Sequence, residues 1–299
     1  MTTMTRDRLV SWEEIQDIEL VVVGRMKEFA MGMHRSVFHG SGFDLLGLRD
    51  WQPGDRPSAV DWAQSSITNF SPLITREFEQ ESTASVVIVA DTSLSTQCGT
   101  DGTPVAKVIA RTVATLALAA AFFQDLVGLV TMDGSSKRLT VPPRTGKNHA
   151  MHCVDAYQDA LAGLDRPTPG ARALSGLLRK RSLIPVVSDF LVADPNPLLD
   201  ECRELNAKHD VFVALVDAAF AFDIPKVSTG WVEGYDIESG HSRILSATEV
   251  EALSRRVRHW QDDTEARARA CGLDVVRVRP GDEHATLSRF LSARRIQKH

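Results

Sequence analysis

Five short apolar runs, separated by segments with helical spacing, constrain the fold of this chain most strongly. The runs cover residues 86–90, 126–131, 183–187, 211–216 and 275–278. A continuous apolar run of about four to eight residues is typical of a strand buried on both faces of a parallel sheet. Strands that alternate with helices indicate a sheet covered by helices on both faces. We therefore expect an α/β protein with a mostly parallel sheet and a further edge strand over residues 137–141.

The apolar spacing also predicts helices between these strands and at both ends of the chain. The expected helices span residues 11–31, 104–124, 149–161, 171–180, 198–208, 247–271 and a last segment that ends at residue 294. Residues 32–82 differ, because their repeated glycines and prolines favour turns over long helices. This pattern predicts two parts. Residues 1–82 form an N-terminal helix and an irregular glycine-rich arm that packs on the main domain, and residues 83–299 form that domain.

The composition argues against several classes of protein. Of the 299 residues, 43% are hydrophobic and 24% are charged, as in ordinary globular domains. A net charge of −5 and a pI near 6.0 argue against a nucleic-acid partner. The four cysteines lack zinc-ligand spacing, which favours reduced thiols in a cytoplasmic protein. The N terminus lacks the apolar core of a secretory signal, and the apolar stretch 113–123 is shorter than the roughly 20 residues that cross a bilayer, so no membrane span is expected.

Oxygen-bearing side chains follow two of the predicted strands. Asp91, Ser93 and Ser95 come directly after the first core strand, and Asp189 follows the strand 183–187. Because the carboxyl ends of parallel strands meet at one edge of a sheet, these side chains are expected to lie together. Carboxylate and hydroxyl oxygens suit Mg²⁺, Mn²⁺ or Ca²⁺. The alternative is that Asp and Ser occur here only because their side chains bond nearby backbone groups in turns.

An enzyme is the main competing class. Asp91 could be the nucleophile of a phosphatase similar to the haloacid dehalogenases, but that chemistry uses a second aspartate two positions later as acid and base, where this chain has Ser93. The sequence contains no G-x-S-x-G elbow and no G-x-x-x-x-G-K-[ST] phosphate loop. We therefore expect a protein that is not an enzyme.

An ordered set of motifs resembles a known family. The motifs are His34-Arg-Ser36, Gly40-Ser-Gly-Phe-Asp44, Leu48-Arg49-Asp-Trp51, Pro53-Gly-Asp55, Val60-Asp61-Trp62, Arg76-Glu-Phe78, Asp91-Thr-Ser-Leu-Ser95, Ser188-Asp-Phe190 and Tyr235-Asp-Ile-Glu-Ser-Gly240. The Asp91–Ser95 motif resembles the metal-ion-dependent adhesion site of von Willebrand factor A domains. The whole set is similar to the bacterial family named domain of unknown function 58.

This resemblance implies a von Willebrand factor A-like, Rossmann-like fold with a bound Mg²⁺, or Mn²⁺ or Ca²⁺. The implied metal ligands are Asp91, Ser93, Ser95, Thr168 and Asp189. A partner's carboxylate would complete the coordination, and the protein would act as an adaptor that works with a MoxR-type AAA+ ATPase on a protein client.

The arm motifs also have an expected role, and the chain departs from the family pattern at two places. Arg49, Asp55, Asp61 and Trp62 are expected to hold the arm on the domain or to contact a partner. Two arginines usual in the family are missing, one from the segment 54–59 and one from the segment 65–68. These losses leave open a structural or interaction module whose metal site is vestigial.

Overall fold

The computed structural model describes residues 8–32, 45–52, 60–78, 84–100, 102–133, 136–163, 181–222, 231–236 and 241–297. These residues belong to two compact units. The first unit contains the described residues up to 32 and from 84 onward, and the second contains those between 45 and 78. Each unit is considered by itself below.

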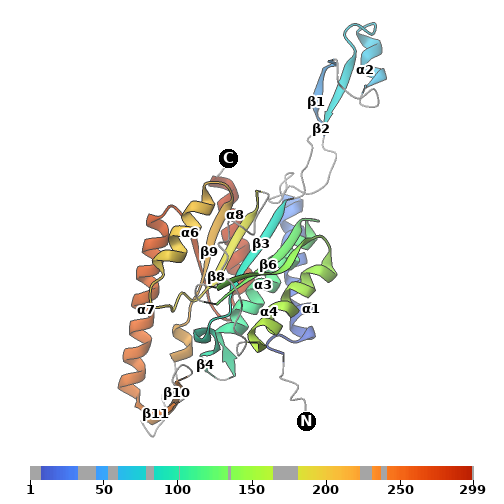
Figure 1. Ribbon diagram of the computed structural model, residues 1–299. Helices are drawn as coiled ribbons and strands as arrows, with labels where there is room; N and C mark the ends of the chain where they lie inside the picture. Colours follow the sequence, from blue (N-terminus) through green and yellow to red (C-terminus); the bar gives the residue numbers. More distant parts are fainter. Residues whose placement is uncertain are drawn as a thin grey trace. The chain divides into compact units, whose positions relative to one another are not determined.

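A six-stranded sheet forms the centre of the first unit (Figure 1). Its strands, in spatial order, are β12 (Asp274–Val278), β9 (Asp210–Val216), β8 (Leu183–Ser188), β3 (Ser85–Asp91), β6 (Leu126–Asp133) and β7 (Ser136–Arg144). The first five are parallel, and β7 pairs with β6 in the antiparallel direction. The predicted Rossmann-like α/β class is therefore confirmed, with β7 as the expected edge strand.

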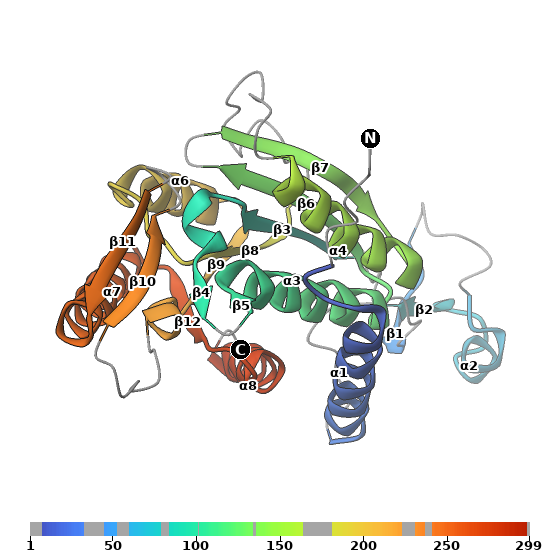
Figure 2. The ribbon, with the colours of Figure 1, turned by 90° about the horizontal axis from the view of Figure 1, so that it is seen from below.

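Helices cover both faces of this sheet (Figure 2). They are α1 (Trp12–Gly32), α3 (Val105–Phe122), α4 (Lys147–Ala162), α6 (Asn196–Asn206), α7 (Ala247–Ala270) and α8 (Glu283–Gln297). Successive side chains of a strand point to opposite faces. Val86 and Ile88 accordingly pack in the cluster with α1, α3, α4 and α8, whereas Val87 and Val89 pack in the cluster with α6 and α7. The predicted helix over residues 171–180 lies outside the described residues.

Helix α3 is the apolar centre of one layer. Within the described ranges it is the one helix whose length and composition would also suit a membrane crossing, and 78% of it is buried inside the protein. Helix α1 lies along it, and Glu14 of α1 forms ion pairs with Lys107 at 3.0 Å and with Arg111 at 3.7 Å. The N-terminal helix thus belongs to the same unit as the sheet.

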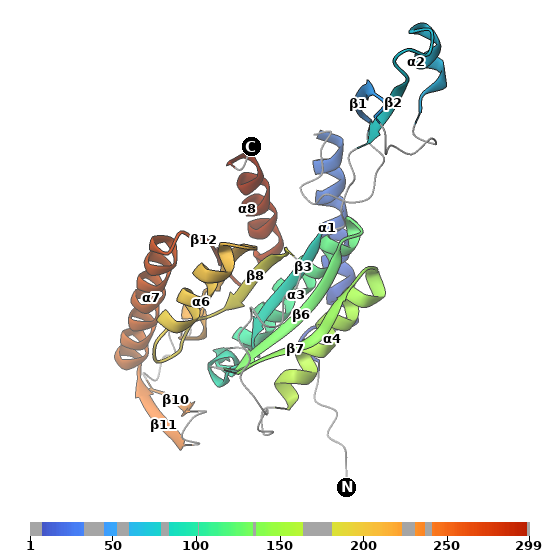
Figure 3. The same ribbon diagram turned by 45° about the horizontal axis from the view of Figure 1, so that its top comes forward.

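Short elements surround the carboxyl ends of the parallel strands. They are the 3₁₀ turns η2 (Leu94–Gln97) and η3 (Ala219–Phe222) and the strand pairs β4 (Gly99–Thr100) with β5 (Thr103–Pro104) and β10 (Trp231–Asp236) with β11 (His241–Ser246). The hairpin β10–β11 leads directly into α7 (Figure 3). Ser246 and Glu249 form a capping box that satisfies amide groups at the start of α7.

The second unit is a small antiparallel hairpin with one short helix. Strand β1 (Leu45–Asp50) pairs with β2 (Ile74–Phe78), and α2 (Trp62–Ile67) lies between them in the sequence. Asp61 caps α2, because its Oδ1 accepts hydrogen bonds at 3.1 Å from the amides of Ala63 and Gln64. The short strands agree with the repeated glycines and prolines of this segment, which favour turns.

Gly128 in β6 provides a test of the packing between β6 and β7. A Cβ at this position would lie 2.9 Å from the carbonyl oxygen of Val141 and 2.9 Å from Cγ of Pro143. Gly128→Ala should therefore destabilise the protein by roughly 1–3 kcal/mol, as overpacking does. Urea unfolding followed by circular dichroism measures the change. The control is Gly24→Ala in α1, where no described atom lies within 4 Å and the helix should gain up to about 1 kcal/mol. Equal effects at the two positions would contradict the close packing of β7 over Gly128.

Candidate metal site

The carboxyl ends of the parallel strands bring the predicted site residues together. Asp91 is the last residue of β3, and Asp189 directly follows β8, the strand next to β3. Ser95 lies in the turn η2 and donates a hydrogen bond from Oγ to Oδ1 of Asp189 at 3.3 Å. Residues 94 positions apart in the sequence therefore touch at one edge of the sheet.

Asp91 is held by groups from three parts of the fold. Its Oδ1 accepts a hydrogen bond at 2.8 Å from the amide of Ser93, and its Oδ2 accepts one at 2.5 Å from Oγ of Ser188. Its backbone oxygen accepts a bond at 2.8 Å from the hydroxyl of Tyr157 on α4. Because Asp91 is only 2% exposed, these contacts fix one orientation of its carboxylate.

The two serines of the motif lie between the two aspartates. The hydroxyl oxygens of Ser93 and Ser95 are 3.0 Å apart, and both side chains are half-buried. Thr96 donates from Oγ1 to the carbonyl oxygen of Ser93 at 2.7 Å, which closes the turn tightly. The turn therefore presents two hydroxyls next to the carboxylates.

Asp189 is fully buried and only partly satisfied. Its Oδ1 accepts hydrogen bonds from the amide of Leu191, at 2.9 Å, and from Ser95. Its Oδ2 is buried and has no hydrogen-bond partner among the described residues. An unpartnered buried carboxylate oxygen is costly, and an ion is one of the groups that can satisfy it.

The pKa of each of the two aspartates is raised, and burial is the largest cause for both. Burial raises the pKa of Asp189, and the nearby charge of Asp91 raises it further. Burial also raises the pKa of Asp91, although the hydrogen bonds from Ser188 and Ser93 oppose the rise, and the charge of Asp133 at the end of β6 adds to it. Two neighbouring buried carboxylates repel each other, and a divalent cation would offset that repulsion.

The donor set fits a hard metal ion. Two carboxylates and two hydroxyls supply only oxygen atoms, as Mg²⁺, Mn²⁺ and Ca²⁺ prefer. Within the described ranges no group of three or more His, Cys, Asp or Glu side chains converges to hold a metal ion. A cation at this edge would depend on the serine hydroxyls as well as on the aspartates.

The other predicted residues are either outside the described residues or in the second unit. Thr168 and Asp55 are outside the described residues, so their roles stay predictions. Arg49 lies in β1 opposite Thr75, and Trp62 begins α2 with 61% of its surface exposed. Arg49, Asp61 and Trp62 all belong to the second unit.

Sequence reasoning assigned no role at the site to four residues that hold it. Ser188 bonds Asp91, Tyr157 bonds the end of β3, and Trp260 and Gln261 of α7 bond the loop that contains Asp189. Ser188 could have been found, because it precedes Asp189 at the end of a strand. The other three lie in helices, where no local pattern marks a contact with a distant loop.

One comparison with known proteins identifies a family. The sequence matches the family described as "Protein of unknown function DUF58" over residues 47–270. It is 27% identical over 292 residues to uncharacterized proteins of Mycobacterium bovis and Mycobacterium tuberculosis, with 94% of this chain and 89% of those proteins covered. A solved mutant of the PilB minor pilin from Streptococcus sanguinis shares 10% identity with a TM-score of 0.38, covering 76% of this chain and 64% of the pilin. The family match spans most of the chain, and the chain therefore belongs to the DUF58 family of proteins of unknown function.

Proposed function

We propose that this protein is a cytoplasmic, non-enzymatic adaptor that binds a protein partner through a divalent cation. In this proposal the first unit is a von Willebrand factor A-like domain, and Asp91, Ser93, Ser95 and Asp189 form a metal-ion-dependent adhesion site. The partner is a MoxR-type AAA+ ATPase, which the adaptor couples to a protein client. Thr168 is a further metal ligand in the same proposal.

One observation carries the proposal. The Asp91–Ser95 turn and Asp189 meet at the carboxyl edge of the sheet, and Oδ2 of Asp189 is buried with no partner among the described residues. Turn residues that only bonded their own backbone would not need a second buried carboxylate beside them. The oxygen-only donor set and the repulsion between the aspartates support a hard cation rather than a structural hydrogen-bond network.

The chain's own residues would hold and orient the cation. Ser188 and the amide of Ser93 fix the carboxylate of Asp91, so both of its oxygens keep their directions. Ser95 and the amide of Leu191 fix Oδ1 of Asp189 and leave Oδ2 available. When bound, Mg²⁺ or Mn²⁺ would supply an open coordination position that suits a carboxylate of the partner.

The residues at this edge favour binding over catalysis. A phosphatase of the aspartyl-nucleophile class uses an acid two positions after the nucleophile, and Ser93 cannot protonate a leaving group in that way. Asp91 itself is 2% exposed and bonded on both carboxylate oxygens, which suits a metal ligand better than an attacking group. We therefore propose that the protein is not an enzyme.

The test is removal of the metal from a defined complex. The purified chain is immobilised, and a nucleotide-free MoxR-type AAA+ ATPase is passed over it in Mg²⁺ and then in EDTA. Nucleotide is left out so that EDTA acts on the adaptor rather than on bound ATP. We expect binding in Mg²⁺, release in EDTA, and recovery when Mg²⁺ is restored.

A matched pair of serine variants sharpens this test. Ser95→Ala removes a proposed ligand and should weaken binding by about tenfold or more, the size of effect seen when groups that hold metal ligands are removed. Ser85→Ala makes the same change at the opposite end of β3, where the serine is 8% exposed, and should leave binding unchanged. Binding that is insensitive to EDTA would sink the metal-dependent mechanism. A metal response of the chain without any ATPase binding would remove the proposed partner only.

A further inference from the structure

The loop that contains Asp189 is held from outside by helix α7. Gln261 donates from Nε2 to the carbonyl oxygen of Asp189 at 2.9 Å, and Trp260 donates from Nε1 to the carbonyl oxygen of Phe190 at 2.9 Å. The two residues are neighbours on α7, about 70 positions from the loop in the sequence. Each bond reaches the backbone, so the loop is held at its main chain.

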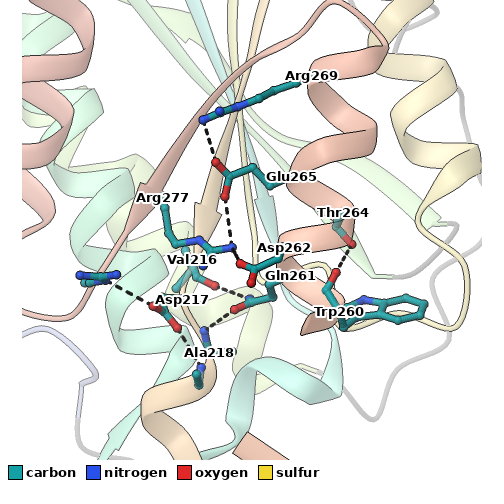
Figure 4. A network of polar contacts seen from close by, with 12 residues as sticks. Val216, Asp217, Ala218, Trp260, Gln261, Asp262, Thr264, Glu265, Arg269 and Arg277 are labelled. Carbon is teal, nitrogen blue, oxygen red and sulfur yellow. Dashed lines mark hydrogen bonds and ion pairs between the residues drawn. The ribbon is translucent and has the colours of Figure 1, made fainter. Parts of the chain in front are cut away.

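The side chain of Gln261 forms three hydrogen bonds to the main chain. Besides the bond to Asp189, Nε2 donates to the carbonyl oxygen of Val216 at 2.8 Å, and Oε1 accepts from the amide of Ala218 at 3.2 Å (Figure 4). Both N–H groups and the carbonyl of the amide are therefore occupied, which allows one orientation only. Gln261 is fully buried, and its hydrogen bonds link the loop after β8 to the loop after β9.

The loop needs such support, because Phe190 has an unfavourable backbone conformation. Its φ is 54°, in the left-handed region that side chains other than glycine rarely adopt. Phe190 is fully buried, its amide donates to Oγ of Ser188 at 2.9 Å, and its carbonyl oxygen accepts from Trp260. A conformation of this kind persists where surrounding contacts determine it, and it tends to occur at functional sites.

Helix α7 also contacts the sheet through residues other than Gln261. Arg277 of β12 forms ion pairs with Asp262 at 2.6 Å and with Glu265 at 3.1 Å, and Arg269 pairs with Glu265 at 2.7 Å (Figure 4). Buried residues of α7, such as Ala268, also pack against the sheet. The bonds of Gln261 thus have a separate effect, which is to set the position of the loops at the carboxyl edge.

We propose that Gln261, assisted by Trp260, is a positioning residue of the metal site, which sets the location of Asp189 and so the affinity for the cation. The change in cation affinity that this inference predicts rests on the proposed function. Groups that orient metal ligands without touching the metal commonly change its affinity by about 10- to 100-fold when they are removed. Gln261 acts in this way through the backbone of the ligand rather than through its side chain.

The test uses the full chain and two variants that remove hydrogen bonds while keeping bulk. In Gln261→Met the amide is lost, and in Trp260→Phe only the indole N–H and part of the ring are lost. Isothermal titration with Mn²⁺ should give a dissociation constant raised at least tenfold for Gln261→Met and severalfold for Trp260→Phe. Hydrogen–deuterium exchange should show faster exchange in the segment 183–191 of Gln261→Met.

Arg277→Met is the matched control, because it loosens α7 from β12 without touching the Asp189 loop. It should lower thermal stability yet leave the Mn²⁺ affinity and the exchange of 183–191 unchanged. The proposal is overturned if folded Gln261→Met keeps the wild-type affinity and exchange, or if Arg277→Met changes both as much. A wild-type protein that binds no Mn²⁺ would refute the proposed function, whereas faster exchange in Gln261→Met would still support the positioning of Asp189.

Discussion

Asp91→Asn should abolish the rise in stability that Mg²⁺ or Mn²⁺ gives to the wild-type protein, and it should make the metal-free protein more stable. Asn can still accept the amide hydrogen bond of Ser93 and can donate to Ser188, so the turn keeps its shape. What is lost is one of two buried negative charges. The repulsion with Asp189 disappears, and the cation loses its best ligand.

Thermal unfolding over a Mg²⁺ or Mn²⁺ titration, with EDTA as the reference, measures both effects. A ligand that binds only the folded state at about 100 times its dissociation constant stabilises by about 2.7 kcal/mol. The wild type should approach this value at saturating metal, and Asp91→Asn should show none of it. A metal response of equal size in both proteins would place the cation elsewhere. No response in either would favour a vestigial site.

Asp125→Asn should stabilise the protein by up to about 4 kcal/mol at pH 8 and hardly at all near pH 4. Asp125 lies at the start of β6, where its Oδ1 accepts a hydrogen bond from the amide of Ala84 at 3.0 Å. Its Oδ2 is buried with no partner among the described residues. Burial raises the pKa of Asp125 to about 7 in the folded protein, from an ordinary value of 3.8.

Asp125 binds its proton more tightly in the folded protein than in the unfolded chain, and this difference sets the sign of the effect. Since the folded pKa is the higher one, the stability contributed by protonated Asp125 is complete below about pH 4 and is lost as the pH rises through 7. A shift of about three pKa units at 1.36 kcal/mol per unit gives the figure of about 4 kcal/mol. Asparagine never ionises, so the variant avoids this loss.

Urea unfolding of the wild type and Asp125→Asn between pH 4 and pH 8 measures the difference in the free energy of unfolding. A difference that stays constant with pH would show that Asp125 does not titrate in this range. The two aspartate variants also serve as controls for each other, because Asp125 lies at the amino ends of the parallel strands and Asp91 lies at their carboxyl ends. Asp125→Asn should keep the full metal response, and Asp91→Asn should keep the pH dependence that Asp125 contributes.

The fold could be predicted from the sequence because its signals are local. Each core strand is an apolar run, and the spacing of residues such as Ile15, Ile18 and Val22 marks the buried face of a helix. The Asp91–Ser95 motif was also local, and the rule that parallel strands end at one edge was enough to join Asp91 with Asp189. The fold, and the meeting of Asp91 with Asp189, could therefore be predicted without any knowledge of side-chain contacts.

The supporting contacts could not be predicted in this way. Tyr157 lies 66 positions from Asp91, and Gln261 lies 72 positions from Asp189. Both are polar residues in helices whose periodicity reveals only which face is buried. Which distant backbone group such a side chain meets depends on how helix and sheet pack, and one sequence does not encode that in a readable pattern.

The two prolines of β7 have a consequence for how this protein can associate. Pro142 and Pro143 lie in the strand at one end of the six-stranded sheet, and proline has no backbone N–H to donate. An exposed edge strand otherwise offers a template for strand addition by another chain, which can lead to aggregation. Because successive residues of a strand direct their N–H groups to opposite sides, the adjacent prolines remove one donor from the open side of β7, and the ladder of a foreign strand would be interrupted there. Strand addition or fibre-like growth at this side of the sheet is therefore weakened at the prolines, and an added strand would have to pair with the part of β7 that precedes them.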